Sequence, residues 1–234
     1  MKHTENELVT LKNEICEMWE LVLSQLEKSK QAFFERNIEL AREIVSREKR
    51  INAFELKIDC DCENYIALYS PVAIDLRLIL SSIKICGTLE RIGDFCEGIA
   101  RFVIDDDCHS IDSKIIDDLQ LDKMFDILIG MLSDCFDAFE SEKTSMCGKI
   151  LSMDNDIDTI YLDALNIFTE YLQKNPPLIR CGLKIYVLMR KLERIGDHCT
   201  NIVEDIVFYI DAKVLKHSGV KNKRKNHPSD SDKE

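Results

Sequence analysis

An eleven-residue segment occurs twice in this chain of 234 residues, and this repeat constrains the fold more than any other feature of the sequence. Residues 89–99 read LERIGDFCEGI and residues 192–202 read LERIGDHCTNI, so eight of the eleven positions are identical. Farther upstream, residues 48–52 (EKRIN) resemble residues 154–158 (DNDID). A pattern duplicated in this way predicts two copies of one supersecondary unit.

Apolar residues recur at a spacing near 3.6 along six stretches, which predicts six long helices. Pro71 falls at the expected start of the third helix, where proline suits the first helical position. Glycine (8) and proline (4) are scarce, which argues against a turn-rich β protein. The expected helices cover about 6–34, 38–69, 71–104, 113–139 and 145–172, with the last running from the Asn175-Pro176-Pro177 break to about 216.

The predicted fold is therefore all-α, with two tandem pseudo-symmetric three-helix bundles. The first unit covers residues 1–107 and the second covers residues 108–216. A three-helix unit of this size can bury a core of its own. Residues 217–234 carry almost no apolar side chains, and we expect them to form a disordered polar tail.

Composition excludes several classes of protein. The net charge of −12 disfavours non-specific binding to nucleic acid. No run of about 18 apolar residues is present, so no membrane span is expected. The ten cysteines lie mostly inside apolar helical patterns, and the opening residues MKHTENELVT lack the apolar stretch expected of a signal peptide. We therefore expect small, buried thiols in a reducing cytosol.

Acidic residues continue the apolar stripe of the third predicted helix instead of lying opposite to it. Glu90, Asp94 and Glu97 are four and three residues apart, so they occupy a narrow sector of one helix face. The last predicted helix repeats the arrangement with Glu193 and Asp197. Neighbouring carboxylates repel each other, and a hard cation between them would remove the repulsion. Each half thus has a candidate metal site.

Carboxylates on the preceding helix could complete each metal shell. Glu48 lies on the second predicted helix of the first unit, and Asp154 and Asp158 lie on that of the second unit. No histidine or cysteine lies on this acidic face at matching positions in both copies, which disfavours a tetrahedral zinc site. The alternative is a solvated helix face, on which Arg91 and Arg194 pair with the acids. The residues alone leave both interpretations open.

A glycine recurs inside the duplicated motif, at Gly93 and Gly196. Glycine in a helix interior costs about 1 kcal/mol relative to alanine. Its repetition therefore predicts the close approach of another helix, for which simple packing is a sufficient reason.

These segments resemble the PhoU family of phosphate-uptake regulators. The resemblance rests on the two LERIGD segments, on the run Pro71-x3-Asp75-Leu76-Arg77 before the first, and on residues 153–158 (MDNDID) before the second. It covers about 1–216, essentially the whole part of the chain that we expect to fold. The resemblance implies two three-helix bundles related by internal pseudo-symmetry. It also implies divalent or trivalent metal ions, such as Fe, Mn, Mg or Zn, often several together.

Position by position, the resemblance implies a set of metal ligands in each half. Asn52 stands where the second half has an acid, so the two sites are expected to differ in affinity or in the number of ions. The implied ligands are Glu48, Glu90 and Asp94 in the first half and Asp154, Asp158, Glu193 and Asp197 in the second.

The resemblance further implies a cytoplasmic regulator, peripheral at the inner face of the membrane, that damps phosphate-starvation signalling. Its implied partners are a phosphate ABC transporter and a sensor histidine kinase, and a homodimer is plausible for such an acidic helical bundle. The sequence has no nucleophile–base pair, phosphate-cradling glycine loop or nucleotide motif, so we do not expect an enzyme.

Two alternative functions stay open. The chain could serve another transporter, such as a sodium–phosphate carrier or a potassium channel, and the sequence does not separate this from the first reading. A carboxylate-bridged metal oxidase or storage bundle would need Glu-x-x-His pairs on helices that face the core. No such pair occurs in the sequence.

Overall fold

The computed structural model describes residues 2–105 and 112–215, with side chains from residue 6 onward. These residues form helices joined by short connections, and the described part contains no strand. The tail predicted for 217–234 and the predicted unit boundary after residue 107 lie outside the described residues. In chain order the elements are α1 (Lys2–Glu35), α2 (Ile38–Tyr69), α3 (Ala73–Ile104), α4 (Ser113–Asp118), α5 (Leu121–Glu140), α6 (Cys147–Lys174), the 3-10 turn η1 (Pro176–Leu178) and α7 (Ile179–Asp211).

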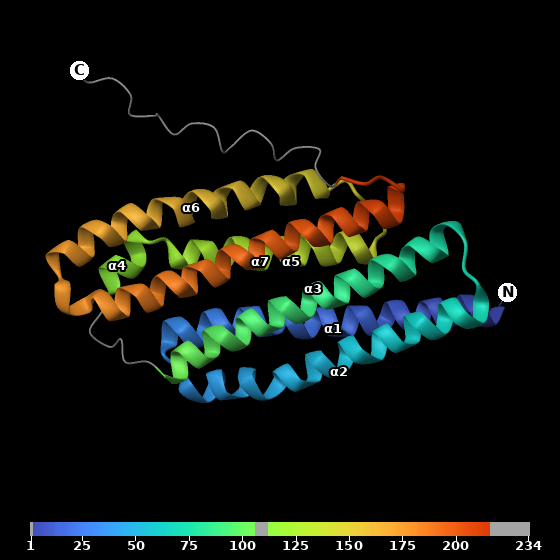
Figure 1. Cartoon of the computed structure of the whole chain (residues 1–234), viewed down its shortest axis with the longest axis horizontal. Coiled ribbons are helices and arrows are strands. Elements are labelled where there is room, and N and C mark those ends of the chain that lie inside the picture. Colours follow the sequence, from blue (N-terminus) through green and yellow to red (C-terminus); the bar gives the residue numbers. More distant parts are fainter. Residues whose placement is uncertain (1, 106–111, 216–234) are drawn as a thin grey trace, which may run out of the picture.

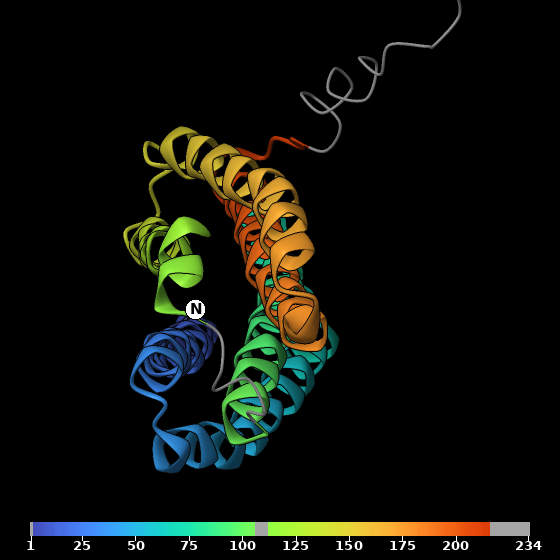
Figure 2. The same ribbon diagram turned by 90° about the vertical axis from the view of Figure 1, so that its left-hand side faces the viewer.

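The long helices form two groups of three, α1–α3 and α5–α7, stacked side by side (Figures 1 and 2). The groups meet where α3 packs against α7 and where α1 packs against α5. The α3–α7 contact, called the seam below, is antiparallel. Ser81 on α3 donates a hydrogen bond to the carbonyl oxygen of Asp205 at 3.0 Å, and Arg77 donates to the carbonyl oxygen of Tyr209 at 3.0 Å.

The core runs through both groups without interruption. Its buried apolar side chains form a single cluster that includes residues of every α-helix. Trp19 of α1 is fully buried, stacks on Phe139 of α5 at 5.7 Å, and donates a hydrogen bond to the carbonyl oxygen of Leu132 at 3.1 Å. The two repeats thus share one hydrophobic core, whereas the sequence had suggested that each could bury its own.

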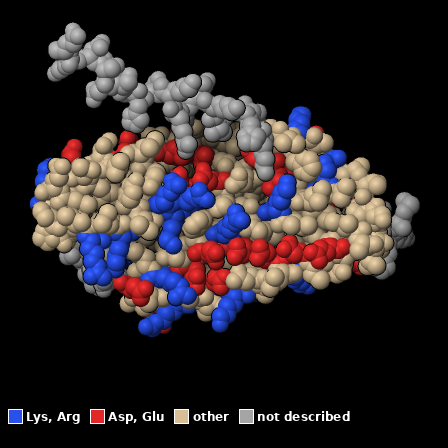
Figure 3. All heavy atoms as spheres, viewed as in Figure 1, with Lys and Arg blue, Asp and Glu red and all other residues tan. Residues whose placement is uncertain are grey.

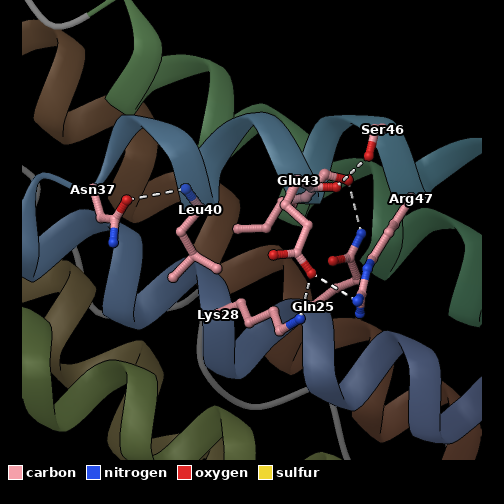
Figure 4. A network of polar contacts seen from close by, with 8 residues as sticks. Gln25, Lys28, Asn37, Leu40, Glu43, Ser46 and Arg47 are labelled. Atoms are coloured by element: carbon pink, nitrogen blue, oxygen red, sulfur yellow. Dashed lines mark hydrogen bonds and ion pairs between the residues drawn. The ribbon is translucent and has the colours of Figure 1, made fainter.

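The packing of α1 on α2 shows how polar groups are matched inside the first group (Figure 4). The side chain of Asn37 caps α2 by accepting a hydrogen bond from the backbone of Leu40 at 3.0 Å. The buried amide of Gln25 donates to the carbonyl oxygen of Ile44 at 2.9 Å. Across the same contact, Glu43 of α2 pairs with Lys28 of α1 at 2.7 Å.

Several helix boundaries differ from those predicted. The helix expected over 113–139 is two helices, because the backbone at Gln120 adopts a left-handed conformation with φ of 52°. Pro71 precedes α3, whose N-cap is Val72, and so is not its first residue. The last helix ends at Asp211, before the left-handed Ala212, and does not reach residue 216.

The cysteines behave largely as predicted. All nine within the described residues are free thiols, and seven of them are buried, Cys86, Cys96, Cys181 and Cys199 among them. Cys60 is exposed. Among the described helices, none is long and apolar enough to cross a membrane.

Candidate metal centres

The first candidate site lies where α2 packs against α3. Gly93 permits this approach, because a Cβ atom there would lie 2.9 Å from the Cδ1 atom of Ile51 on α2. Burial raises the pKa of Glu90 on α3, and so do the charge of Asp94 and then those of carboxylates on α2, among them Glu48. Three of the predicted ligands, from two helices, therefore share one groove.

Two further acids of α2, Glu55 and Asp59, lie near this site, although they lie outside the segments that resemble each other in the two repeats. The Oε1 atom of Glu55 lies 3.5 Å from the position that a Cβ atom would take at Gly87 of α3. Burial raises the pKa of both Glu55 and Asp59, and their mutual proximity raises that of Glu55 further. The signal was present in the sequence, because Glu48, Asn52, Glu55 and Asp59 follow one another at spacings of four, three and four, along one helix face.

The second candidate site lies where α6 packs against α7. A Cβ atom at Gly196 would lie 2.8 Å from the Oδ1 atom of Asp154, so the carboxylate rests directly against the α7 backbone. Burial raises the pKa of Glu193, followed by the charge of Asp197, and Asp158 contributes in the same direction. Asp158 and Asp197 thus both interact with Glu193, and Asp154 lies against the same stretch of α7.

Arginines neutralise part of the charge in the second site. The Nη1 atom of Arg190 lies 2.8 Å from the Oε1 atom of Glu193, one turn away on the same helix. Arg194 lies 3.8 Å from the carboxylate of Asp197. The pairing of Arg194 that the sequence suggested is therefore present.

Glu97 has a different environment from the other predicted ligands. Its Oε1 atom lies 2.7 Å from the Nη2 atom of Arg101, in an ion pair one turn apart along α3. Glu97 therefore takes part in a local ion pair. It is not among the carboxylates whose charges raise the pKa of Glu90.

Three buried oxygen atoms in these grooves have no hydrogen-bond partner among the described residues. They are the Oδ1 atoms of Asn52 and Asp59 in the first groove and the Oε2 atom of Glu193 in the second. A buried polar atom without a partner costs on the order of 1–3 kcal/mol. Oxygen atoms are the ligands that hard cations such as Mg²⁺ and Mn²⁺ take, so the donor set fits a metal ion.

The acids are neighbours without being fully assembled around an ion. Within 2–105 and 112–215, no group of three or more carboxylate, thiol or imidazole side chains has an arrangement that could hold a metal. Predicted donors thus lie near one another on paired helices, while the metal site stays a prediction.

The two grooves differ beyond the shared motif. In the first, the stripe of α2 continues as the acids Glu55 and Asp59. The equivalent positions on α6 are Tyr161 and Leu165, and Tyr161 stacks on Tyr186 of α7 with ring centroids 5.3 Å apart. The acidic residues therefore extend farther along the first site, whereas a pair of stacked aromatic rings follows the second.

The charge pattern is visible on the face formed by α2, α3, α7 and α6 (Figure 3). Acidic side chains gather in a long band over α2 and α3, and a second acidic group lies toward α6. Lysine and arginine side chains lie between them, along the seam. Acidic side chains of both repeats are therefore exposed on this face of the molecule.

Known proteins match this chain over almost its whole length. The model of the PhoU domain matches twice, at residues 15–103 and 121–206. The phosphate-specific transport system accessory protein PhoU of Edwardsiella tarda is 30% identical over 222 residues, which cover 93% of this chain and 90% of that protein. The protein of the same name from Escherichia coli is 29% identical over 213 residues, covering 91% of this chain and 87% of the relative.

Solved structures agree with these matches. The crystal structure of the phosphate transport system regulatory protein PhoU from Streptococcus pneumoniae superposes with a TM-score of 0.81 at 26% identity, covering 91% of this chain and 99% of that one. PhoU from Pseudomonas aeruginosa superposes with a TM-score of 0.81 at 27% identity, covering 89% and 99%. The duplicated helical architecture is therefore common to all of these chains.

Proposed function

This chain belongs to the PhoU family, and from that membership we propose that it is a cytoplasmic, metal-binding regulator of phosphate uptake and phosphate-starvation signalling. It would act through contacts with a phosphate ABC transporter and a sensor histidine kinase, at the inner face of the membrane. The observation that carries the proposal is the match of both repeats, over nearly the full length, to accessory proteins of phosphate-specific transport systems.

Metal ions would bind in the two grooves. The first would use Glu48, Asn52, Glu90 and Asp94, with Glu55 as a further donor. A bound ion supplies positive charge that offsets the repulsion between these carboxylates, and it links α2 to α3. The buried Asn52 oxygen, which has no partner among the described residues, supports this assignment.

The second groove would hold its ion through four carboxylates: Asp154 and Asp158 from α6 and Glu193 and Asp197 from α7. Asp158 supplies a charge where the first groove has the neutral Asn52, so the second site would bind more tightly on this count. Mg, Mn, Fe or Zn are the candidate metals, and the oxygen-rich donor set favours the harder ions. We assign the chain no catalytic step, so its effect on phosphate signalling would come from contacts with other proteins.

Metal content gives a direct test of the sites. We would purify the full chain without added metal and measure bound metal by elemental analysis. The double variant E90Q/D94N should lose about half of the metal if the two sites are independent, and E193Q/D197N should lose the other half. The control D117N/D118N changes two exposed acids of α4, away from both grooves, and should keep the full content. Unchanged stoichiometry in both groove variants would refute the metal assignment.

Regulation needs a test in cells. The gene would be expressed in a bacterial strain that lacks its own PhoU relative and carries a reporter of the phosphate-starvation response. The proposal expects the reporter to be repressed in phosphate-rich medium and phosphate uptake to be restrained. Expression of folded protein without either effect, in a host whose own relative restores both, would contradict the proposed function.

A further inference from the structure

A cavity lies at each end of the seam, and repeat symmetry relates the two. The first cavity, of about 400 Å³, opens between the C-terminal part of α3 and the N-terminal part of α7. The second, of about 370 Å³, opens between the N-terminal part of α3 and the C-terminal part of α7. Gly98 and Lys191 line the first cavity, and their repeat equivalents, Asn201 and Thr88, line the second.

The charged residues that line the second cavity balance one another. It is lined by two basic residues, Lys84 and Arg91, and by two acids, Glu204 and Asp205. The Nζ atom of Lys84 lies 3.1 Å from the Oδ1 atom of Asp205, so a cation and an anion are already paired across the seam. Nothing in this charge balance calls for a charged ligand.

The first cavity is basic. Arg101, Lys184 and Lys191 line it together with a single acid, Asp105. Arg101 also pairs with Glu97 on its own helix at 2.7 Å, whereas Asp105 is the one acid in the cavity lining itself. At the position of Arg101 the other cavity has Glu204, so the repeat symmetry is broken in favour of positive charge. Such a patch stands out in a chain whose net charge is −12.

Lys191 occupies the cavity wall in an unusual way. A Cβ atom at Gly98 would lie 2.2 Å from its Nζ atom, so the amine rests directly against the α3 backbone at this glycine. Within the part of the chain that the structure describes, Lys191 forms no ion pair and no hydrogen bond. Its ammonium group is therefore available to an anion from outside.

Apolar side chains continue the cavity along α7. Ile179, Leu183 and Val187 follow at four-residue spacing on one helix face, with 47%, 57% and 56% of their surface exposed. Phe102 of α3 lines the same cavity as Leu183 and Val187. A row of exposed apolar residues beside basic ones is typical of a protein-binding groove.

We propose that this groove, formed by Phe102, Leu183, Val187, Lys184, Lys191 and Arg101, binds an acidic amphipathic helix of a partner protein. The apolar stripe of that helix would pack on Leu183 and Val187, and its flanking carboxylates would pair with the basic residues. The proposal rests on the proposed function only in taking the partner to be a protein. Acidic bands on this face of the molecule (Figure 3) oppose the other obvious occupant, an anionic membrane surface.

The test uses the full chain and a defined probe. The probe is a fluorescently labelled helical peptide of about 18 residues, some 27 Å long, with leucines at i, i+4 and i+8 and glutamates beside them. We expect saturable binding in fluorescence anisotropy, weakened by salt because charge pairs contribute. A peptide with lysines in place of the glutamates is the charge control and should not bind.

Variants then locate the binding site. Leu183→Asp and Lys191→Glu should each weaken binding by about tenfold or more, since both change the groove itself. Leu162→Asp on α6 and Lys123→Glu on α5 are matched controls, because both residues are exposed outside the groove, and binding should be unchanged. Helical content by circular dichroism would show that each variant is folded.

Three results would overturn the proposal: no saturable binding of the acidic peptide, equal affinity in the groove variants and the wild type, or groove-dependent binding of phosphatidylglycerol vesicles but not of peptide. Metal content and repression of the phosphate reporter are measured independently of peptide binding, so that the two proposals can fail separately. If both persist while the peptide fails, the groove assignment alone is wrong. If the peptide binds the groove while repression fails, the regulatory function is wrong and the docking site stands.

Discussion

Phe95 of α3 and His198 of α7 stack on each other across the seam, with ring centroids 5.7 Å apart and an angle of 30° between the ring planes. The two residues occupy the same position in the duplicated motif. A contact between equivalent positions marks the point where an approximate twofold axis passes between the repeats. It explains why the cavities on either side are related to each other.

The stacked histidine should make stability depend on pH. Burial, then the charges of Arg194 and Arg91, lowers the pKa of His198 from 6.5 to about 4. Between these values the unfolded chain binds a proton that the folded chain does not, so stability falls as pH is lowered from 6.5 toward 4. We expect a loss of about 1–2 kcal/mol between pH 7 and pH 5 from this group alone. Urea unfolding in the presence of a chelator measures it.

His198→Phe is the matching variant, because phenylalanine is what the other repeat has at this position. The variant should fold, and its stability should lack the part of the pH dependence that His198 causes. The difference in unfolding free energy between wild type and variant should therefore change by about 1–2 kcal/mol between pH 7 and pH 5. Parallel pH profiles for the two proteins would show that His198 titrates normally in the folded state.

The motif glycines should respond differently to alanine. Gly196→Ala would place a methyl group 2.8 Å from the Oδ1 atom of Asp154 and push that carboxylate aside. Gly93→Ala would meet the flexible tip of Ile51 at 2.9 Å. We expect Gly196→Ala to weaken cation binding in the second groove by about tenfold, and Gly93→Ala to act chiefly on stability, by about 1 kcal/mol. Calorimetric metal titration and urea unfolding separate the two effects.

Gly148 supplies the control, since a Cβ atom there would meet nothing within 4 Å. Gly148→Ala on α6 should raise stability by up to about 1 kcal/mol through helix propensity and leave metal binding unchanged. Equal metal affinity in all three variants would mean that Asp154 takes no part in binding a cation.

Asn52→Asp should make the first groove resemble the second. The new carboxylate would occupy the place of a buried oxygen that has no hydrogen-bond partner among the described residues. Without metal it should lower stability by about 1 kcal/mol through repulsion and desolvation, and with a divalent cation it should raise the affinity of this site. Asn166→Asp, exposed on α6, is the control. A loss of stability that no cation reverses would argue against a site at Asn52.

Tyr209 should stabilise the end of α7 through Glu142. The buried Tyr209 hydroxyl donates to the Oε1 atom of Glu142 at 3.0 Å, and Lys12 of α1 pairs with the same carboxylate. Tyr209→Phe should therefore cost about 1 kcal/mol at pH 7 in urea unfolding. The control is Tyr171→Phe. The Tyr171 hydroxyl makes no hydrogen bond to the described residues, so this substitution should lower the unfolding free energy by less.

The pH dependence of this contact follows from the carboxylate. The hydrogen bond from Lys12, with a smaller contribution from Tyr209, lowers the pKa of Glu142 from 4.5. Its stabilising effect is therefore present above pH 4.5 and is lost as pH falls through the lowered value. The cost of Tyr209→Phe should shrink in the same range. A cost that is constant down to low pH would assign the effect to packing instead.

The sequence predicted the helical architecture well wherever a single periodic pattern decided it. The bounds of α2 are those expected, 38–69, because a capping asparagine and a clear apolar stripe define its start and course. The break at Gln120 could not be foreseen, since apolar residues continue through Ile115, Leu119 and Leu121 without a glycine or proline. There the requirements of packing override local preference.

The candidate sites were predictable where the ligands repeat, and not beyond. Glu90 and Glu193 were found because each lies in a duplicated motif. Glu55 lies outside that motif, and its spacing from Glu48 and Asn52 is a weaker signal, which the packing of α2 on α3 makes meaningful. Likewise, the basic cavity joins Arg101 to Lys191, which are 90 positions apart in the chain, so no local pattern could reveal it.

The contact between Phe95 and His198 also bears on how such a chain could arise. A single ancestral repeat would meet a second copy of itself through this same position on the same axis. The present chain is then a covalent version of a homodimer, and duplication of the gene freed one half to change without the other. The contrast between a basic cavity at one end and a charge-balanced one at the other is the kind of divergence that a true homodimer, whose halves share every mutation, could never acquire.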